Sequence, residues 1–581
     1  MNTILRVAVP LAFCILHCAA QVPITAKPAN FKEWTYSPNS VFGISRLANV
    51  EHRPYCKVWK SDVATAKIQQ YNAFGTLLNT TTVRFVNGII SQIATTNRWG
   101  DTYYTTKFAP AGPEQFKVTS IQSGENALFP AKSARYIFKN KLLTEIQYLS
   151  YDGNPIKDEN GVATIRYKRF VDPIRYSLIQ EMTFYDESEQ PVLSHSWDAH
   201  KVVYERDERG NRTSEAYFGV DGEPLVNRFG GFKMRGKYNE ADELISSTYV
   251  GLNDEAANNA YGISTSVYEY DKGLLTKLIR SDFAGHIVRA AAALDGIAIV
   301  RYEYDDNGNE RRRAFFDELD KPMNTPAGYQ SITYKYSPNG MLLRTEYFDK
   351  AGQPAVDRSG IHRYDYERDD KGRLTQLAYF DKQDQPMQDK NNEVFMVKYK
   401  YDELGRRYSE SYWKDANTKM NRWNGYHETV SRYNDDGQKV EELTFDENGK
   451  LFVAKNGFSR VVSVYDQFGR MSELSYFNDQ IPSVMVDSFI TKLHTVRFAY
   501  DKNGRLSEIS YFDAQNKPVN AEASLEENAI SVHRVQLMYQ GNRVVEELLY
   551  SVGSDVPSMK IDCLKHDYIG SNGVSIGRKD Q

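Results

Sequence analysis

The sequence is short of cysteine and of long apolar segments, and each shortage excludes a class of protein. Only four cysteines occur among 581 residues, and Cys14 and Cys18 fall within the first twenty. A disulfide-rich scaffold is therefore excluded. No apolar run after residue 20 approaches the roughly 20 residues that a transmembrane helix needs, so none is expected in the mature chain. Lys and Arg number 72 against 76 Asp and Glu, which is no basic excess for binding nucleic acid.

The first twenty residues have the organisation of a secretory signal. The apolar run Val7–Leu16 follows a short, positively charged start, and Cys18 and Ala20 are small residues suited to a cleavage site. We therefore expect cleavage after Ala20 and export to the periplasm, the cell surface or the exterior. The mature chain keeps Cys56 and Cys563, which can form one long-range disulfide or remain two separate thiols.

Aromatic residues are abundant, and they recur in a repeated unit. The chain has 74 aromatics, of which 40 are tyrosines, enough to exclude disorder over most of its length. Consecutive units begin at Gly328, Gly360 and Glu393. Prolines mark the same phase 32 residues apart, at Pro322, Pro354 and Pro386. The self-similarity predicts roughly twelve units of about 32–36 residues, in the range of stacked repeat proteins.

Each unit reads as a β-hairpin. Tyr399 and Tyr401 alternate with charged residues, which is typical of a half-buried strand, and the turn Asp402–Gly405 follows. In another unit the three-residue step from Leu374 to Leu377 predicts a β-bulge just after the turn glycine. The proline that follows the return strand should end it. The fold class is therefore all-β, with tandem hairpins stacked into an elongated or spirally wound β-solenoid or β-shell.

The hairpin motif resembles the YD repeat of RHS-type and teneurin-like proteins. Tyr399–Arg406, Phe498–Leu506 and Tyr465–Met471 carry the resemblance, which extends over residues 126–550. It implies a spiral β-shell. The period here is longer than that of the family, and Arg206 and Arg368 replace the tyrosine before the turn. The C-terminal core motif that precedes a toxin domain in RHS proteins is not found in this sequence.

Four segments are expected. Residues 1–20 are the signal peptide, and residues 21–125 are an N-terminal cap with degenerate repeats. Residues 126–550 hold the tandem YD-like hairpins, and residues 551–581 form a C-terminal tail.

Few residues suggest chemistry. His195–His200 includes two histidines and an aspartate that could hold a transition metal, but it lies in a linker where polar residues are common. Asp305–Glu310 resembles a calcium loop, yet its glycine stands fourth, where a hairpin turn needs it, and not sixth. No nucleophile elbow, phosphate loop or dinucleotide motif occurs in a suitable context. We therefore expect no enzyme activity, no cofactor and no metal site.

Aromatic residues outside the repeat phase are better candidates for ligand binding than the aromatics that alternate along the repeat strands. These candidates are Trp197, Trp413, Trp423 and Tyr426. The predicted function is that of an exported, non-catalytic repeat protein that presents an extended binding or scaffold surface to a protein or polysaccharide. One alternative is a carbohydrate-active enzyme with its site in residues 21–125 or in the His195–His200 linker. Another, which rests on the resemblance, is a shell or accessory protein of a secreted toxin system.

Overall fold

The structure is a computed structural model. It describes residues 21–23, 26–37, 40–46, 50–112, 115–123, 133–139, 142–149, 153–158, 160–169, 178–290, 296–390, 393–435, 437–466, 469–483, 485–486, 490–501, 505–525, 528–540 and 543–563. The predicted signal peptide and most of the predicted tail lie outside these residues. Every regular element in the described ranges is a β-strand, which confirms the all-β prediction. Within the same ranges there is no helix of the length and apolar character needed to cross a membrane.

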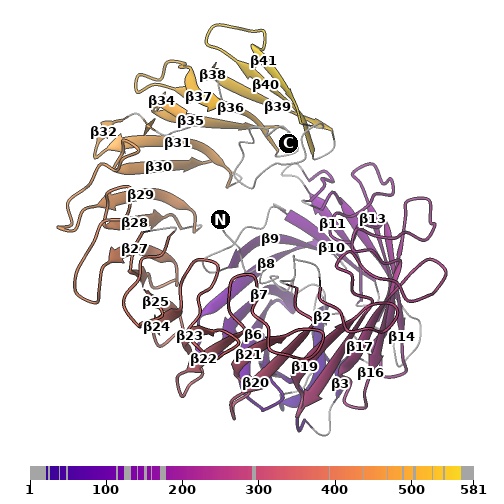
Figure 1. Cartoon of the computed structure of the whole chain (residues 1–581). Coiled ribbons are helices and arrows are strands. Elements are labelled where there is room, and N and C mark those ends of the chain that lie inside the picture. Colours follow the sequence, from indigo (N-terminus) through magenta and orange to yellow (C-terminus); the bar gives the residue numbers. More distant parts are fainter. Residues whose placement is uncertain are drawn as a thin grey trace. The chain divides into compact units, whose positions relative to one another are not determined.

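The chain divides into two compact units, and the division at residue 391 falls inside the repeat region. Unit 1 comprises Met1–Leu149 and Pro155–Asn391, and unit 2 comprises Ser150–Asn154 and Asn392–Gln581. Figure 1 labels the strands of both units. Cys56 in unit 1 and Cys563 in unit 2, the two cysteines of the predicted mature chain, are both buried.

Unit 1 pairs its strands β4 to β25 antiparallel in chain order. Its strands are β1 (Gln21–Pro23), β2 (Ala29–Ser37), β3 (Ser40–Arg46), β4 (Tyr55–Asp62), β5 (Thr65–Tyr71), β6 (Leu77–Val86), β7 (Ile89–Asn97), β8 (Thr102–Gly112), β9 (Gln115–Ser123), β10 (Ser133–Lys139), β11 (Leu142–Leu149), β12 (Thr164–Arg169), β13 (Ile179–Tyr185), β14 (Lys201–Arg206), β15 (Arg212–Phe218), β16 (Lys233–Tyr238), β17 (Leu244–Val250), β18 (Thr265–Asp271), β19 (Leu274–Ser281), β20 (Ile299–Tyr304), β21 (Glu310–Phe316), β22 (Ser331–Tyr336), β23 (Leu342–Phe348), β24 (Arg363–Arg368) and β25 (Leu374–Phe380). One apolar cluster gathers side chains of the N-terminal strands, among them Ile68, Val83 and Phe116.

Unit 2 continues the same antiparallel pairing and adds a small second sheet made of β33, β34, β37 and β38. Its strands are β26 (Met396–Tyr401), β27 (Arg407–Trp413), β28 (Glu428–Tyr433), β29 (Lys439–Phe445), β30 (Arg460–Tyr465), β31 (Met471–Asn478), β32 (Ile481–Pro482), β33 (Met485–Val486), β34 (Ile490–Leu493), β35 (Thr495–Tyr500), β36 (Leu506–Phe512), β37 (Ala521–Leu525), β38 (Asn528–Val532), β39 (Arg534–Gln540), β40 (Arg543–Tyr550) and β41 (Met559–Asp562).

The hairpins have the register that the sequence predicts. In β26 and β27, Lys400 pairs with Ser409 and Tyr401 pairs with Arg407, which leaves Tyr408 as the extra residue of a bulge. The same register shift occurs near the turn in the neighbouring hairpins of both units. The predicted bulge is therefore confirmed.

In the turns of the repeats, an acidic side chain accepts hydrogen bonds from backbone amides of its own turn. The Asp369 side chain accepts hydrogen bonds from the amides of Lys371 (3.0 Å) and Arg373 (2.9 Å). Asp349 and Asp357 do the same in two turns of the preceding repeat. The turn begun by Asp357, between the two that the sequence revealed, was not predicted. Such local bonds satisfy amides that no strand partner reaches.

In several hairpins, a hydroxyl near the end of the first strand forms a hydrogen bond to the preceding hairpin. Tyr433 donates to the Arg407 carbonyl (2.6 Å), and four more tyrosines make the equivalent bond: Tyr304, Tyr465, Tyr500 and Tyr539. Arg368 stands in this position in its own repeat and donates Nε to the Leu342 carbonyl at 3.2 Å. Arginine can replace tyrosine here because both supply a long donor to the same carbonyl.

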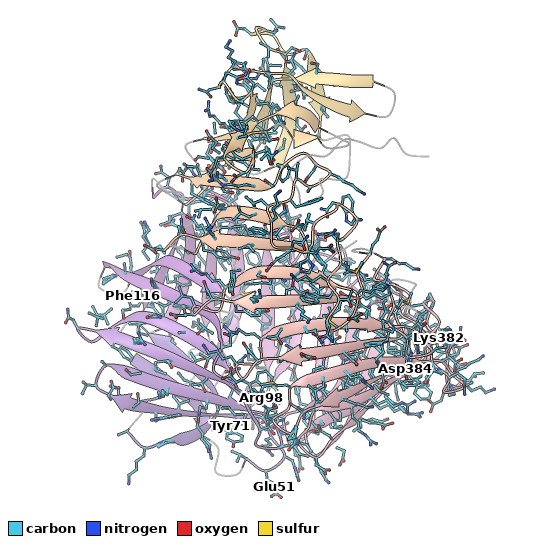
Figure 2. All side chains as sticks on the ribbon, turned by 90° about the vertical axis from the view of Figure 1, so that its left-hand side faces the viewer. Glu51, Tyr71, Arg98, Phe116, Lys382 and Asp384 are labelled. Atoms are coloured by element: carbon cyan, nitrogen blue, oxygen red, sulfur yellow. The ribbon has the colours of Figure 1, made fainter. Side chains whose placement is uncertain are left out.

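Within unit 1, loops of the N-terminal strands rest against turns of the repeats, a contact that the sequence did not reveal. Asn72 Nδ2 donates to the Asn307 carbonyl (3.2 Å), and Trp99 Nε1 donates to the Asn339 carbonyl (3.1 Å). Arg98 Nη2 donates to the Gly340 carbonyl, and Figure 2 shows Arg98 where the N-terminal strands meet the repeat strands. We call this contact the seam.

Candidate binding surface

A cluster of aromatic and charged side chains lies between β27 and β28 of unit 2. Arg422 Nη1 donates to the hydroxyls of Tyr412 (3.2 Å) and Tyr426 (3.1 Å), and the Tyr412 hydroxyl donates to Glu410 Oε1 (2.9 Å). Burial, together with the nearby Glu410 carboxylate, raises the pKa of Tyr412 well above its usual value. Its hydroxyl therefore stays protonated and can donate. The cluster fixes Arg422 in one position.

Arg422 occupies a position that an Asn or Asp holds in other repeats. Asn259 and Asp357 begin the equivalent turns, where their side-chain oxygens accept two backbone amides. An arginine side chain has no acceptor, so it reaches across to the two tyrosine hydroxyls instead. Trp423 is the next residue of the turn and is 49% exposed.

The other predicted residues of this repeat are more enclosed than Trp423. Trp413 is half-buried, with Lys398 Nζ 3.9 Å from a ring centroid, and its Nε1 donates to Ser411 Oγ at 2.9 Å. Tyr426 is only 9% exposed. Both rings contribute chiefly to packing, so Trp423 is the candidate in unit 2 with a face open to a ligand.

Trp197 belongs to unit 1. It is half-buried against an apolar cluster, with its ring centroid 6.5 Å from that of Tyr217. Nearby His200 is buried, and its Nδ1 lies 2.8 Å from the Phe184 carbonyl. In the described part of the chain, no three histidine, cysteine or acidic side chains gather closely enough to hold a metal ion.

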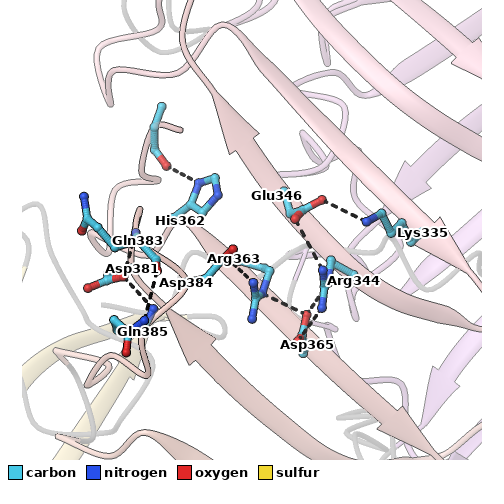
Figure 3. A network of polar contacts seen from close by, with 11 residues as sticks. Lys335, Arg344, Glu346, His362, Arg363, Asp365, Asp381, Gln383, Asp384 and Gln385 are labelled. Atoms are coloured by element: carbon cyan, nitrogen blue, oxygen red, sulfur yellow. Dashed lines mark hydrogen bonds and ion pairs between the residues drawn. The ribbon is translucent and has the colours of Figure 1, made fainter. Parts of the chain in front are cut away.

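A ladder of ion pairs crosses β22, β23 and β24 of unit 1 (Figure 3). Arg344 binds Asp365 through two hydrogen bonds of 2.7 and 2.9 Å, and it also lies 3.7 Å from Glu346. Arg363 lies 3.3 Å from the same Asp365 and forms a second ion pair with Asp384. The opposite charges alternate, so each strand is linked to its neighbour through side chains as well as through the backbone.

The same face repeats a cation over an aromatic ring. Arg363 lies 3.8 Å from the Phe380 ring centroid. Other hairpins carry equivalent pairs, namely Arg166 over Tyr185, Arg301 over Phe316, Arg460 over Phe477, Arg497 over Phe512 and Arg534 over Tyr550. Cation–π contacts of this kind contribute about 0.5–2 kcal/mol each. A cation over an aromatic ring therefore recurs in several hairpins of each unit, although Phe316, Tyr550 and Arg363 are buried.

We expect the buried end of the ladder to contribute to the free energy of unfolding and the exposed end to contribute little. The Arg363 side chain is 9% exposed and Lys335, at the other end, is 63% exposed. Arg363→Ala removes two ion pairs and a cation–π contact, so we expect the free energy of unfolding of unit 1 to fall by about 2–3 kcal/mol. Lys335→Ala should change it by less than about 0.5 kcal/mol. Urea unfolding followed by circular dichroism tests this, and equal losses in the two variants would contradict it.

Sequence reasoning missed Arg422 and the ladder. The signal for Arg422 was its place directly before Trp423, where Asn259 and Asp357 stand in other repeats. The ladder gave no such signal, because the pairs that link its successive elements, Arg344–Asp365 and Arg363–Asp384, join residues 21 positions apart and surface strands carry many charges.

No protein-family model matches the chain, and no curated protein matches it. Among solved structures, the chain is similar to TcdB2-TccC3 without its hypervariable C-terminal region, at 11% identity and a TM-score of 0.31, over 85% of this chain and 27% of that one. It is also similar to full TcdB2-TccC3 (10% identity, TM-score 0.29, 92% and 31%) and to a Photorhabdus luminescens Tc holotoxin pore (12%, 0.24, 86% and 30%). The chain thus spans about a third or less of these proteins. At these values the similarity is limited to a distant resemblance between β-repeat chains.

Proposed function

We propose that this chain is an exported, non-catalytic repeat protein that presents an extended surface to a polysaccharide or protein of the cell envelope or exterior. The observation that carries the proposal is the recurrence of a cation over an aromatic ring in several hairpins of each unit, a pattern that we call the periodic face. Adjacent strands are about 4.8 Å apart, so equivalent positions of neighbouring hairpins recur about every 10 Å, and the cation–π pairs occupy several of these positions. A polymer or a repetitive protein has a matching periodicity and can contact several repeats at once.

Export rests on the sequence of residues 1–20, whose charged start, apolar run and small residues have the pattern of a cleavable signal. The charged side chains of the periodic face are largely paired with one another, as Arg344 is with Asp365. This arrangement suits a stable contact surface, because the pairs hold the side chains in defined positions before a partner arrives.

Co-sedimentation tests the proposal. Purified residues 21–581 are mixed with envelope polysaccharide isolated from the source organism, before and after bound protein is stripped from it. We expect pelleting, either with both preparations if the partner is a polysaccharide or only with the unstripped one if it is a protein. The heat-unfolded chain serves as the control. A folded chain that stays in the supernatant with both preparations would overturn the proposal.

A second candidate is a shell or accessory protein of a secreted toxin system. The YD-type motif of Tyr399–Arg406 favours it, since RHS-type proteins carry that motif. This alternative predicts no pelleting in the experiment above and co-purification of the chain with a toxin polypeptide. The remaining alternative, a carbohydrate-active enzyme, predicts release of reducing sugar from the polysaccharide preparation.

A further inference from the structure

We propose that the turn of Trp423 and the next turn along unit 2, which carries Lys455, form a binding site for an acidic polysaccharide. This inference rests on the proposed function and names its ligand class. The sugar ring would stack on the Trp423 indole, and a carboxylate of the same polymer would pair with the Lys455 ammonium.

The indole of Trp423 is not required by its turn. Equivalent turns of unit 1 carry Ala260, Pro326 or Arg358 at this position, and they close with the same backbone bonds. Trp423 is nevertheless 49% exposed, although an exposed indole costs free energy in water. An aromatic face held open to solvent is a platform for stacking, and a sugar ring offers a matching apolar face.

Lys455 is placed beside this platform by the backbone. Its amide donates to the Asn424 carbonyl at 3.1 Å, so the two turns are direct neighbours. The Lys455 side chain is exposed and forms no ion pair with any described residue. Its ammonium is therefore available to a ligand carboxylate, whereas the arginines of the periodic face are largely paired.

The side chains beneath the Trp423 indole are held in fixed positions. Arg422 is held by the hydroxyls of Tyr412 and Tyr426, and Tyr412 is 1% exposed. Asn424 is 8% exposed, and its Oδ1 is buried without a hydrogen-bond partner in the structure. The base under the Trp423 turn is therefore enclosed and pre-organised before a ligand binds.

The geometry favours a polysaccharide over an acidic protein segment. Aromatic anchors of protein interfaces are generally enclosed in desolvated pockets, whereas Trp423 stands on an open turn. Successive turns recur about every 10 Å, so a ligand that touches both must be extended. A chain of sugars meets this requirement, and a single sugar does not.

Affinity electrophoresis of the mature chain in gels that contain polygalacturonate, or neutral dextran as the uncharged probe, tests the inference. We expect retardation by polygalacturonate, reduced in high salt because the carboxylate contact is screened. Trp423→Ala should weaken binding at least about tenfold, as truncation of an aromatic anchor does. Lys455→Gln should weaken it about threefold to fivefold and reduce its salt dependence.

Two matched variants serve as controls. Leu404 is 74% exposed on another turn of unit 2, and Lys382 is an exposed lysine of unit 1. Leu404→Ala and Lys382→Gln should bind polygalacturonate as the unaltered chain does.

Each other outcome has a definite meaning. Unchanged binding by Trp423→Ala would overturn the site, and equal retardation by dextran with no effect of Lys455→Gln would overturn the acidic ligand. If neither polymer retards a chain that pellets only with unstripped envelope polysaccharide, the inference fails but the proposed function stands, with a protein as the partner. If the chain neither pellets nor is retarded, both fail.

Discussion

Gly273→Ala is expected to destabilise unit 1 by about 3 kcal/mol more than Gly285→Ala does. Both glycines lie in turns with positive φ, +80° and +87°, so both substitutions carry the same backbone strain of about 1 kcal/mol. They differ in what an added methyl group meets. At Gly273 it would overlap the His52 carbonyl oxygen and lie 2.6 Å from the Ala73 Cβ. At Gly285 nothing lies within 4 Å.

The difference between these variants measures the seam, because His52 and Ala73 belong to the N-terminal part of unit 1. Backbone atoms cannot move aside as a flexible side chain can, so the N-terminal loops must shift to admit the methyl group. Urea unfolding of both variants gives the difference in the free energy of unfolding. Limited proteolysis supplies a second measurement, since a displaced seam exposes residues 50–76 to cleavage. Equal stability of the two variants would show that these loops do not rest on the repeat turns.

The second large effect is a loss of stability in alkali. Burial, with smaller contributions from neighbouring charges, raises the pKa of each of four tyrosines to about 12: Tyr304, Tyr334, Tyr336 and Tyr511. The unfolded chain releases these protons near pH 10, whereas the folded chain keeps them until about pH 12. Above pH 10 the folded state therefore binds more protons, and stability falls as pH rises.

The size of the alkaline effect follows from the pKa difference. One unit of pKa corresponds to about 1.4 kcal/mol, and discounting for partial exposure leaves about 1 kcal/mol for each tyrosine. The three in unit 1 should together remove about 3 kcal/mol between pH 10 and pH 12. The free energy of unfolding, measured by urea titration across pH 9–12, tests this, with absorbance at 295 nm reporting the ionisation of tyrosine.

Substitutions separate this effect from general alkaline damage. Tyr334→Phe removes one of the buried hydroxyls, so the fall in stability with pH should become shallower. Tyr408 is 36% exposed, and Tyr408→Phe serves as the control for the loss of a hydroxyl that is not buried. A chain whose stability is flat up to pH 12 would contradict the expected proton linkage.

The repeating hairpin could be predicted because its determinants are local. The Asp402 side chain accepts hydrogen bonds from the amides of Leu404 and Arg406, and Gly405 supplies the positive φ of the same turn. All of these residues lie within five positions of the sequence, so the turn motif can be recognised without knowledge of the fold. The turn begun by Asp357 was missed because it follows no strand that alternates.

The candidate site could be predicted only in part. The sequence singled out Trp413, Trp423 and Tyr426 as aromatics outside the repeat phase. For two of them this was wrong: Trp413 holds the position of Phe380 and Phe445 in their repeats, and Tyr426 holds that of Tyr329 and Phe458. Their exposure depends on neighbours, however, since Lys398 covers Trp413 and Arg422 binds Tyr426. Trp423 remains 49% exposed, which no property of a tryptophan in a sequence reveals.

The sequence by itself determined the β-hairpin repeat, its turns and its bulges, since these depend on side-chain alternation and on contacts within a few residues. Only the tertiary structure decided which segments meet across the chain. Asn72 and Asn307 are 235 residues apart, and Trp99 and Asn339 are 240 apart. Such contacts depend on the twist accumulated over all the intervening strands. No single residue encodes that sum, so neither the seam nor the open face of Trp423 could be read from residue order.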